Sequence, residues 1–219
     1  GVFLLDEADK AHPDVLQPFL NVFDEGWIVD QRGVKAHANH AIFVLTTNVG
    51  QKMIADMHSK GKSDEEITER MKEALSQIKH GKANRPVFSP EFLSRLKRVI
   101  VFRPLDEEAM GAIARRHAAK TAEQWQARRK KRLAIAAELI EYLGAEAHRV
   151  NTKSNGKEGG RIVRKLFSDL VDAALERAIA ADVAGYQRAA LLSVEPAEGW
   201  NAEARPEIRV RFAVEGEVS

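Results

Sequence analysis

The amino-acid sequence predicts an α/β protein, in which part of a parallel sheet with its helices is followed by a smaller, mainly helical α+β domain. The unbroken apolar run at residues 2–5 and the mainly apolar segment 41–47 (AIFVLTT) predict buried strands of a parallel sheet. After Pro104 the chain becomes rich in Ala, Arg and Glu, and its apolar residues follow helical spacing. We therefore expect one domain over residues 1–104 and a second over residues 105–219.

The composition is that of a globular protein with a hydrophobic core. Of the 219 residues, 44% are hydrophobic and 30% are charged, and the net charge is only +2. Such a near-neutral chain gives no bulk electrostatic support to a nucleic-acid partner. The absence of cysteine excludes disulfides and thiolate metal sites. No apolar run approaches the roughly 18 residues of a membrane span, and no signal peptide is visible. We expect no nucleic-acid partner, no membrane partner and a cytoplasmic location.

The first helix is expected over residues 13–24. Pro13 suits a first helical turn and Gly26 suits a helix end. Pro18 conflicts with a straight helix, because proline removes a backbone donor and crowds the preceding turn. The other elements expected before Pro104 are a hairpin over 27–38, helical sequence over 51–80, a short helix over 90–96 and a third buried strand over 99–102.

The second domain is expected to be built mainly from amphipathic helices. Asp106 is placed to cap a long helix that reaches about residue 127. The remaining elements expected are a helix over about 135–147, a loop over 151–160, an amphipathic helix over 161–181 and two alternating runs, 191–194 and 208–212, that could pair as strands.

Two carboxylates, Asp6 and Glu7, directly follow the first apolar run. Ligands of α/β proteins bind in the crevice beyond the carboxyl ends of the strands. A carboxylate pair there can hold Mg²⁺ and orient an attacking water. An acidic turn that merely ends the strand explains the same residues equally well.

The next buried strand ends in Thr46-Thr47-Asn48. The neutral amide of Asn48 can hydrogen-bond a phosphate or its attacking water without adding charge. An asparagine at a strand end also suits an ordinary turn. Its position favours function, because two successive parallel strands should bring Asn48 to the sheet edge that carries Asp6 and Glu7.

Two arginines are candidates for contact with phosphate. Arg95 ends the short helix of SPEFLSRL, and Arg161 opens the amphipathic helix after Gly159-Gly160. Guanidinium stabilises the charge that develops on a transferred phosphoryl group. The alternatives are a surface arginine for Arg95 and a solvated basic helix face, shared with Arg164 and Lys165, for Arg161.

Two other patterns are weaker. The HANH sequence at residues 37–40 lacks further ligands at metal-site spacing, so we expect surface histidines on a hairpin. The basic run ARRKKR at 127–132 lacks interleaved aromatic residues, so we expect a solvated helix end.

Taken together, these motifs resemble those of the Clp-type AAA+ ATPases (ClpB-, ClpA- and ClpV-like proteins) from residue 2 to about 175. LLDEADKAHPDV resembles their Walker B strand and the helix after it, and FVLTTNVG resembles their sensor-1 strand. FSPEFLSRL resembles their arginine-finger segment, and VIVFRPL resembles the strand that leads into the small subdomain. GGRIVRKL is similar to their sensor-2 helix.

This resemblance implies a role for each candidate residue. Asp6 would coordinate the magnesium ion of MgATP, and Glu7 would be the catalytic base or position the attacking water. Asn48 would sense the γ-phosphate. Arg95 would act in trans on the nucleotide of a neighbouring subunit, and Arg161 would act in cis. The resemblance further implies ATP and Mg²⁺ as cofactors, a hexameric ring, protein substrates and, over 24–35, a secondary loop near the central pore.

The resemblance also implies that the chain is the carboxyl-terminal part of an ATPase module. Neither the phosphate-binding loop G-x-x-x-x-G-K-[ST] nor an aromatic-glycine pore loop occurs in the sequence, and residue 1 opens an apolar strand without an initiator Met. We therefore expect a truncated AAA+ large subdomain over 1–104 and a small, or lid, subdomain over 105–219. We expect the parent protein, but not this chain alone, to hydrolyse ATP.

Several alternatives stay open. No [Leu/Ile]-Gly-[Phe/Leu] tripeptide lies between Val49 and Ser89, so a ClpP-type peptidase partner is not expected. A ClpB-like disaggregase and a ClpV-like ATPase of type VI secretion, which disassembles sheaths, remain. A non-catalytic oligomerisation or docking module is the alternative from another class, and a DNA-linked AAA+ protein fits less well. The sequence departs from the family at Lys97-Arg98, where acidic residues are usual, and in its long loop before Arg161.

Overall fold

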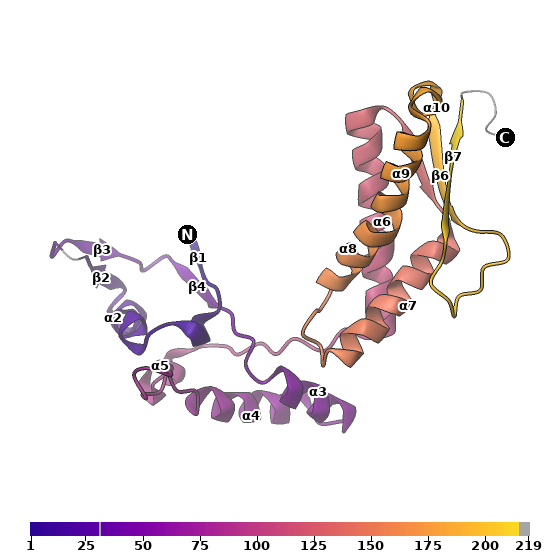
Figure 1. Cartoon of the computed structure of the whole chain (residues 1–219). Coiled ribbons are helices and arrows are strands. Elements are labelled where there is room, and N and C mark those ends of the chain that lie inside the picture. Colours follow the sequence, from indigo (N-terminus) through magenta and orange to yellow (C-terminus); the bar gives the residue numbers. More distant parts are fainter. Residues whose placement is uncertain (31, 215–219) are drawn as a thin grey trace. The chain divides into compact units, whose positions relative to one another are not determined.

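A computed structural model describes residues 1–30 and 32–214 of the chain (Figure 1). The chain divides into two compact units, Gly1–Arg103 and Pro104–Ser219. None of the helices in the two described ranges is both long enough and apolar enough to cross a bilayer.

One sheet of the first unit is formed by two parallel strands that lie side by side in Figure 1. Strand β1 (Val2–Leu5) pairs with β4 (Ile42–Leu45) in a register that runs from Val2 opposite Ile42 to Leu5 opposite Leu45. The parallel strands were predicted, but their full burial was wrong, since Val2 is 70% exposed and Ile42 is 62% exposed. Each strand has a single hydrogen-bonded neighbour within the described residues, so part of the apolar surface faces solvent.

The conflict predicted at Pro18 divides the first helix in two. Helix α1 (Pro13–Leu16) ends before Gln17, and α2 (Pro18–Glu25) starts anew at the proline. Gly26 ends α2 in the left-handed conformation, with φ of 74°, and its N–H donates to the carbonyl of Val22 at 3.1 Å.

The remaining elements of the first unit are short. They are the 3₁₀ helix η1 (Ala8–Lys10), the antiparallel hairpin of β2 (Trp27–Val29) and β3 (Lys35–His37), and helices α3 (Gln51–Ser59), α4 (Asp64–Ser76) and α5 (Pro90–Arg95). The hairpin and the short helix α5 confirm their predictions. The helical sequence over 51–80 divides into α3 and α4, because Ser63 and Glu66 form a capping box that begins a new helix.

The predicted third strand over 99–102 was wrong. These residues adopt no regular secondary structure and form no ladder with any strand of the described chain. Ile100 and Phe102 are 74% and 86% exposed. An apolar run forms a strand only where a neighbouring strand accepts its backbone hydrogen bonds, and the described part of the first unit offers none here.

The second unit consists of helices packed beside a sheet. Its helical elements are α6 (Glu107–Arg129), α7 (Ala137–Lys153), α8 (Arg161–Phe167), the π-helical turn η2 (Ser168–Asp172), α9 (Ala173–Ala181) and α10 (Val183–Arg188). Asp106 caps α6 as predicted, by accepting a hydrogen bond from the N–H of Ala109 at 2.8 Å. The amphipathic helix predicted over 161–181 is present as the continuous run α8, η2 and α9.

A three-stranded sheet completes the second unit. Strand β6 (Leu191–Pro196) pairs antiparallel with β7 (Ile208–Ala213), which confirms the predicted pairing, and parallel with β5 (Arg132–Ile135), which was missed. The fully buried side chains between this sheet and the helices include Met110, Leu139, Leu143, Val163, Phe167, Val171, Leu192 and Val194. The parallel sheet portion of the first unit and the mainly helical second unit confirm the predicted α/β fold class.

Candidate functional site

The carboxyl ends of β1 and β4 bring three of the candidate residues together. Asp6 and Glu7 follow β1, and Asn48 follows β4, whose last residue lies opposite Leu5. The side-chain amide Nδ2 of Asn48 donates to Oε1 of Glu7 at 3.3 Å. The parallel register therefore confirms that Asn48 shares a sheet edge with the two carboxylates.

Thr46 links the two strand ends, and its importance was missed from the sequence. Its hydroxyl donates to Oδ1 of Asp6 and accepts from the backbone N–H of Glu7, the latter at 3.0 Å. Its carbonyl also accepts from the N–H of Ala8 at 2.9 Å. One threonine thus fixes both the carboxylate of Asp6 and the backbone of Glu7. The only sequence signal was its place at the start of the Thr-Thr-Asn motif.

Glu7 adopts a backbone conformation that non-glycine residues rarely use. Its φ of 52° and ψ of 45° lie in the left-handed region. Such conformations persist where surrounding contacts enforce them, and they cluster at functional sites. Its Oε2 atom pairs with Nζ of Lys10 at 2.7 Å, and this hydrogen bond raises the pKa of Lys10. The Glu7 carboxylate is therefore held between the cation of Lys10 and the amide of Asn48.

Arg95 is the last residue of α5 and is held firmly within the first unit. Its Nε donates to both carboxylate oxygens of Asp24, at 2.8 and 2.9 Å, and its Nη1 donates to the carbonyl of Glu91 at 3.0 Å. The hydrogen bond from Arg95 lowers the pKa of Asp24. Asp24 lies on α2 and was not singled out from the sequence.

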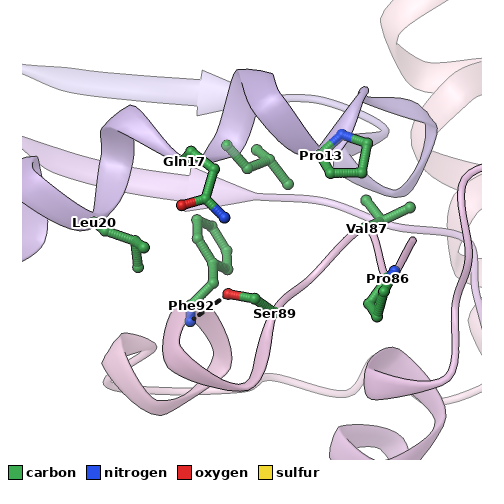
Figure 2. A pocket seen from close by; sticks show the side chains of 8 residues that line it. Pro13, Gln17, Leu20, Pro86, Val87, Ser89 and Phe92 are labelled. Carbon is green, nitrogen blue, oxygen red and sulfur yellow. Dashed lines mark hydrogen bonds between the residues drawn. The ribbon is translucent and has the colours of Figure 1, made fainter. Parts of the chain in front are cut away.

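Helix α5 is anchored at its other end as well. Figure 2 shows the hydroxyl of Ser89 accepting from the N–H of Phe92, a 3.2 Å bond that caps the helix. Phe92 is buried and packs against Phe23 of α2, with ring centroids 5.6 Å apart. The small hollow in Figure 2 is lined by Pro13, Leu16, Gln17, Leu20, Pro86, Val87, Ser89 and Phe92. Its lining comes from α1, α2, α5 and the loop before α5, so the hollow is part of the packing that anchors α5.

Arg161 opens α8 in the second unit. It is exposed, while Ile162 and Val163 after it are buried in the core of that unit. Of the two glycines before it, Gly159 is anchored by Asn151, whose Oδ1 accepts from the N–H of Gly159 at 2.8 Å. Asn151 is only 5% exposed, and no sequence pattern identified it.

The weaker candidates carry no site in the described residues. His37 and His40 join no group of three possible metal ligands within those residues. In the basic run 127–132, Lys131 donates to the carbonyl of Gln187 at 3.2 Å, and Arg129 lies 4.4 Å from the centre of the Trp125 ring. Part of this run is therefore engaged in packing within the second unit.

Comparison with known proteins identifies the family. The profile of the AAA domain (Cdc48 subfamily) matches residues 1–99. The chain is 32% identical over 179 residues to the chaperone protein ClpB2, chloroplastic, of Oryza sativa subsp. japonica, and 39% identical over 113 residues to the chaperone protein ClpB of Meiothermus ruber. These matches cover 82% and 52% of the chain. The chain belongs to the Clp-type AAA+ ATPases.

The match to these AAA+ ATPases covers a small share of each relative. It spans 17% of the Oryza protein and 12% of the Meiothermus protein. Among solved structures, the chain is similar to one titled closed-state cryoEM reconstruction of Hsp104:ATPyS and FITC casein, with a TM-score of 0.69 and 22% identity. That similarity covers 95% of this chain and 32% of the Hsp104 chain, and it supports the AAA+ fold.

Proposed function

We propose that the chain is the carboxyl-terminal part of the ATPase module of a protein-remodelling chaperone. The longer parent protein would couple ATP hydrolysis to the threading or disassembly of protein substrates. The observation that carries this proposal is the shared edge of β1 and β4, where the amide of Asn48 contacts the carboxylate of Glu7 beside Asp6. The ClpB relatives add support, because their printed names describe chaperones.

The donor groups at this edge suit a magnesium-nucleotide. Mg²⁺ prefers hard oxygen ligands, often from one or two carboxylates together with substrate phosphates. Thr46 donates a hydrogen bond to Oδ1 of Asp6, and no described residue hydrogen-bonds Oδ2. Asp6 therefore offers Oδ2 as such a ligand. MgATP, when bound, supplies the phosphoryl group that is transferred to water.

The proposed roles of the side chains follow from their chemistry. The carboxylate of Glu7 would orient the attacking water and accept its proton, while the amide of Asn48 would donate to a γ-phosphate oxygen. Arg95 would donate N–H groups to the nucleotide of a neighbouring subunit, where charge develops in the transition state. Arg161 would contact the nucleotide of its own subunit. The expected assembly is a hexameric, cytoplasmic ring without a ClpP-type peptidase partner, and ClpV-like sheath disassembly is a variant of the same reaction.

The first experiment is calorimetric titration of this chain with MgATP and MgADP. Because the sequence has no phosphate-binding loop, we expect no binding and no hydrolysis by the chain alone. Micromolar binding would contradict the assignment of a missing loop. The second experiment uses the longer protein that contains this segment. There Glu7→Gln should bind MgATP and trap the ring without turnover, and undiminished turnover would remove Glu7 from its proposed role.

A non-catalytic docking module is the second candidate. Exposed apolar side chains on the β1–β4 sheet favour it, namely Val2, Leu4 and Ile42. Such a surface suits burial against another protein segment. A longer protein that retains the module but shows no dependence of ATP turnover on Glu7 or Arg95 would favour this second function.

A further inference from the structure

Asp24 occupies a position that helix electrostatics disfavours. It lies in the last turn of α2, next to Glu25, and that turn contains no basic residue. The carboxyl end of a helix carries partial negative charge, so two carboxylates there are unfavourable for the isolated helix. Residues that break a local rule of this kind are often retained for a function elsewhere in the fold. In this structure, the unfavourable negative charge of Asp24 is compensated by an ion pair with Arg95.

The contact between Asp24 and Arg95 uses one edge of the guanidinium group. The Nε atom donates to both oxygens of Asp24, and Nη1 donates to the carbonyl of Glu91 and the hydroxyl of Ser94, at 3.0 and 3.2 Å. The Nη2 atom donates to no other described residue. The arginine side chain is 34% exposed. Three groups therefore immobilise Arg95 while leaving Nη2 available to an oxygen acceptor.

Packed aromatic side chains and a helix cap lie next to the Asp24–Arg95 pair in the sequence. Phe23, adjacent to Asp24, packs against Phe92 of α5, and Phe92 is 2% exposed. Helix α5 is capped by Ser89 at its start. A charged side chain held by packed neighbours loses less conformational entropy when it engages a ligand. The pair thus links α2, which comes shortly after Asp6 and Glu7 in the sequence, to the helix that carries Arg95.

We propose that Asp24 is a positioning residue for Arg95, which holds the Nε edge of the guanidinium so that Nη2 is presented to a phosphate oxygen of a nucleotide on a neighbouring subunit. This inference rests on the proposed function of Arg95. It assigns Asp24 no contact with substrate. The opposite possibility is that Asp24 sequesters Arg95, in which case removal of the carboxylate would raise turnover.

The test uses the longer protein that contains this segment, assembled as a ring. Misplacement of a catalytic group by about 1 Å costs on the order of 100-fold in rate, so we expect Asp24→Asn to lower kcat by about 10–100-fold. The KM for ATP should stay within about twofold, because the substitution removes an interaction used in the transition state rather than in ground-state binding. Asp24→Glu, which keeps the negative charge, should recover part of the loss.

A double-mutant cycle tests whether the effect of Asp24 on turnover depends on Arg95. Arg95→Ala should lower kcat by about 10³-fold or more, and Asp24→Asn combined with Arg95→Ala should lose no more than Arg95→Ala alone, since both act through one guanidinium. The control is Glu65→Gln, which replaces an exposed carboxylate on α4 of the same unit, outside the proposed site, and should leave kcat unchanged.

The outcomes distinguish this inference from the proposed function. If Arg95→Ala leaves turnover intact, the proposed role of Arg95 fails. If Arg95→Ala abolishes turnover but Asp24→Asn has no effect or accelerates it, only the positioning role of Asp24 fails. Additive losses in the double variant would likewise overturn positioning, because they would show that Asp24 acts independently of Arg95.

Discussion

Replacement of the buried Asn151 by alanine should loosen the segment that leads into Arg161. The Oδ1 atom of Asn151 accepts the N–H of Gly159 at 2.8 Å, and Asn151 is 5% exposed. Asn151→Ala removes this acceptor and leaves a donor without its partner. An unsatisfied buried donor costs about 1–3 kcal/mol. Because Gly159 is only partly buried, water can reach its N–H in part, and the lower half of that range, about 1–2 kcal/mol, applies.

Two measurements on the chain itself check this magnitude. A loss of that size in a unit of this length should lower the midpoint of thermal unfolding by roughly 4–8 °C. Native-state hydrogen exchange should show a loss of protection at the Gly159 amide of about 5–30-fold, since 1.4 kcal/mol corresponds to a factor of ten. The exchange readout is local, so it separates a loosened segment from a general loss of stability.

The matched control is Ser154→Ala in the same segment. The hydroxyl of Ser154 donates to the carbonyl of Asn151 at 2.9 Å. Its removal leaves an acceptor that the N–H of Gly156 still engages at 2.8 Å, so the expected cost is below about 1 kcal/mol. If Asn151→Ala and Ser154→Ala change the Gly159 exchange rate equally, the assignment of Asn151 as the anchor of this segment is refuted.

Three further predictions concern packing, pH and the sheet edge. Gly144→Ala should destabilise the second unit by about 1–3 kcal/mol, because the new Cβ would lie 2.7 Å from the Cα of Gly111. In the control, Gly111→Ala, the new Cβ meets only the flexible end of an arginine side chain, so the midpoint of thermal unfolding should stay unchanged. Burial lowers the pKa of His117, so the folded state favours the neutral imidazole, and the contribution of His117 to folding stability is present above about pH 6.5 and is lost as the pH falls. His117→Phe should therefore reduce the change in unfolding midpoint between pH 7 and pH 5. An unchanged dependence of the midpoint on pH would argue against this cause. Thr46→Val keeps the side-chain shape but removes the hydroxyl that donates to Asp6. It should lower ATP turnover of the longer protein by at least about tenfold without preventing assembly. Turnover at the wild-type rate would show that this hydroxyl has no role at the site.

Elements whose signal is local could be predicted from the sequence. Asp106 caps α6, Pro18 divides the first helix, and the runs of β6 and β7 pair as expected, because capping, proline geometry and alternation act over a few residues. Strand β5 was missed because it has only four residues and begins at the last residue of the basic run 127–132. Its pairing of Leu133 with Leu192 depends on a partner far along the sequence.

Burial in the first unit was predicted less well for a related reason. Apolar runs at β1, β4 and residues 99–102 indicate strands suited to a covered parallel sheet. Whether such a run is buried, or even paired, depends on which neighbouring strands and helices are present. Phe102 and Val2 are therefore exposed despite their sequence context, while Phe92 on a short helix is almost fully buried.

The candidate site shows the same division between what a motif indicates and what only the fold determines. Asp6, Glu7 and Asn48 could be chosen because their chemistry and their strand-end positions agree, and the parallel register brings them to one edge. The left-handed backbone of Glu7 could not be predicted, since no glycine marks it. That conformation is stabilised by Thr46, whose hydroxyl accepts the Glu7 N–H, and by the Asn48 contact to its carboxylate. Because both stabilising groups lie on the segment that directly follows β4, any movement of β4 relative to β1 would act directly on the orientation of Glu7.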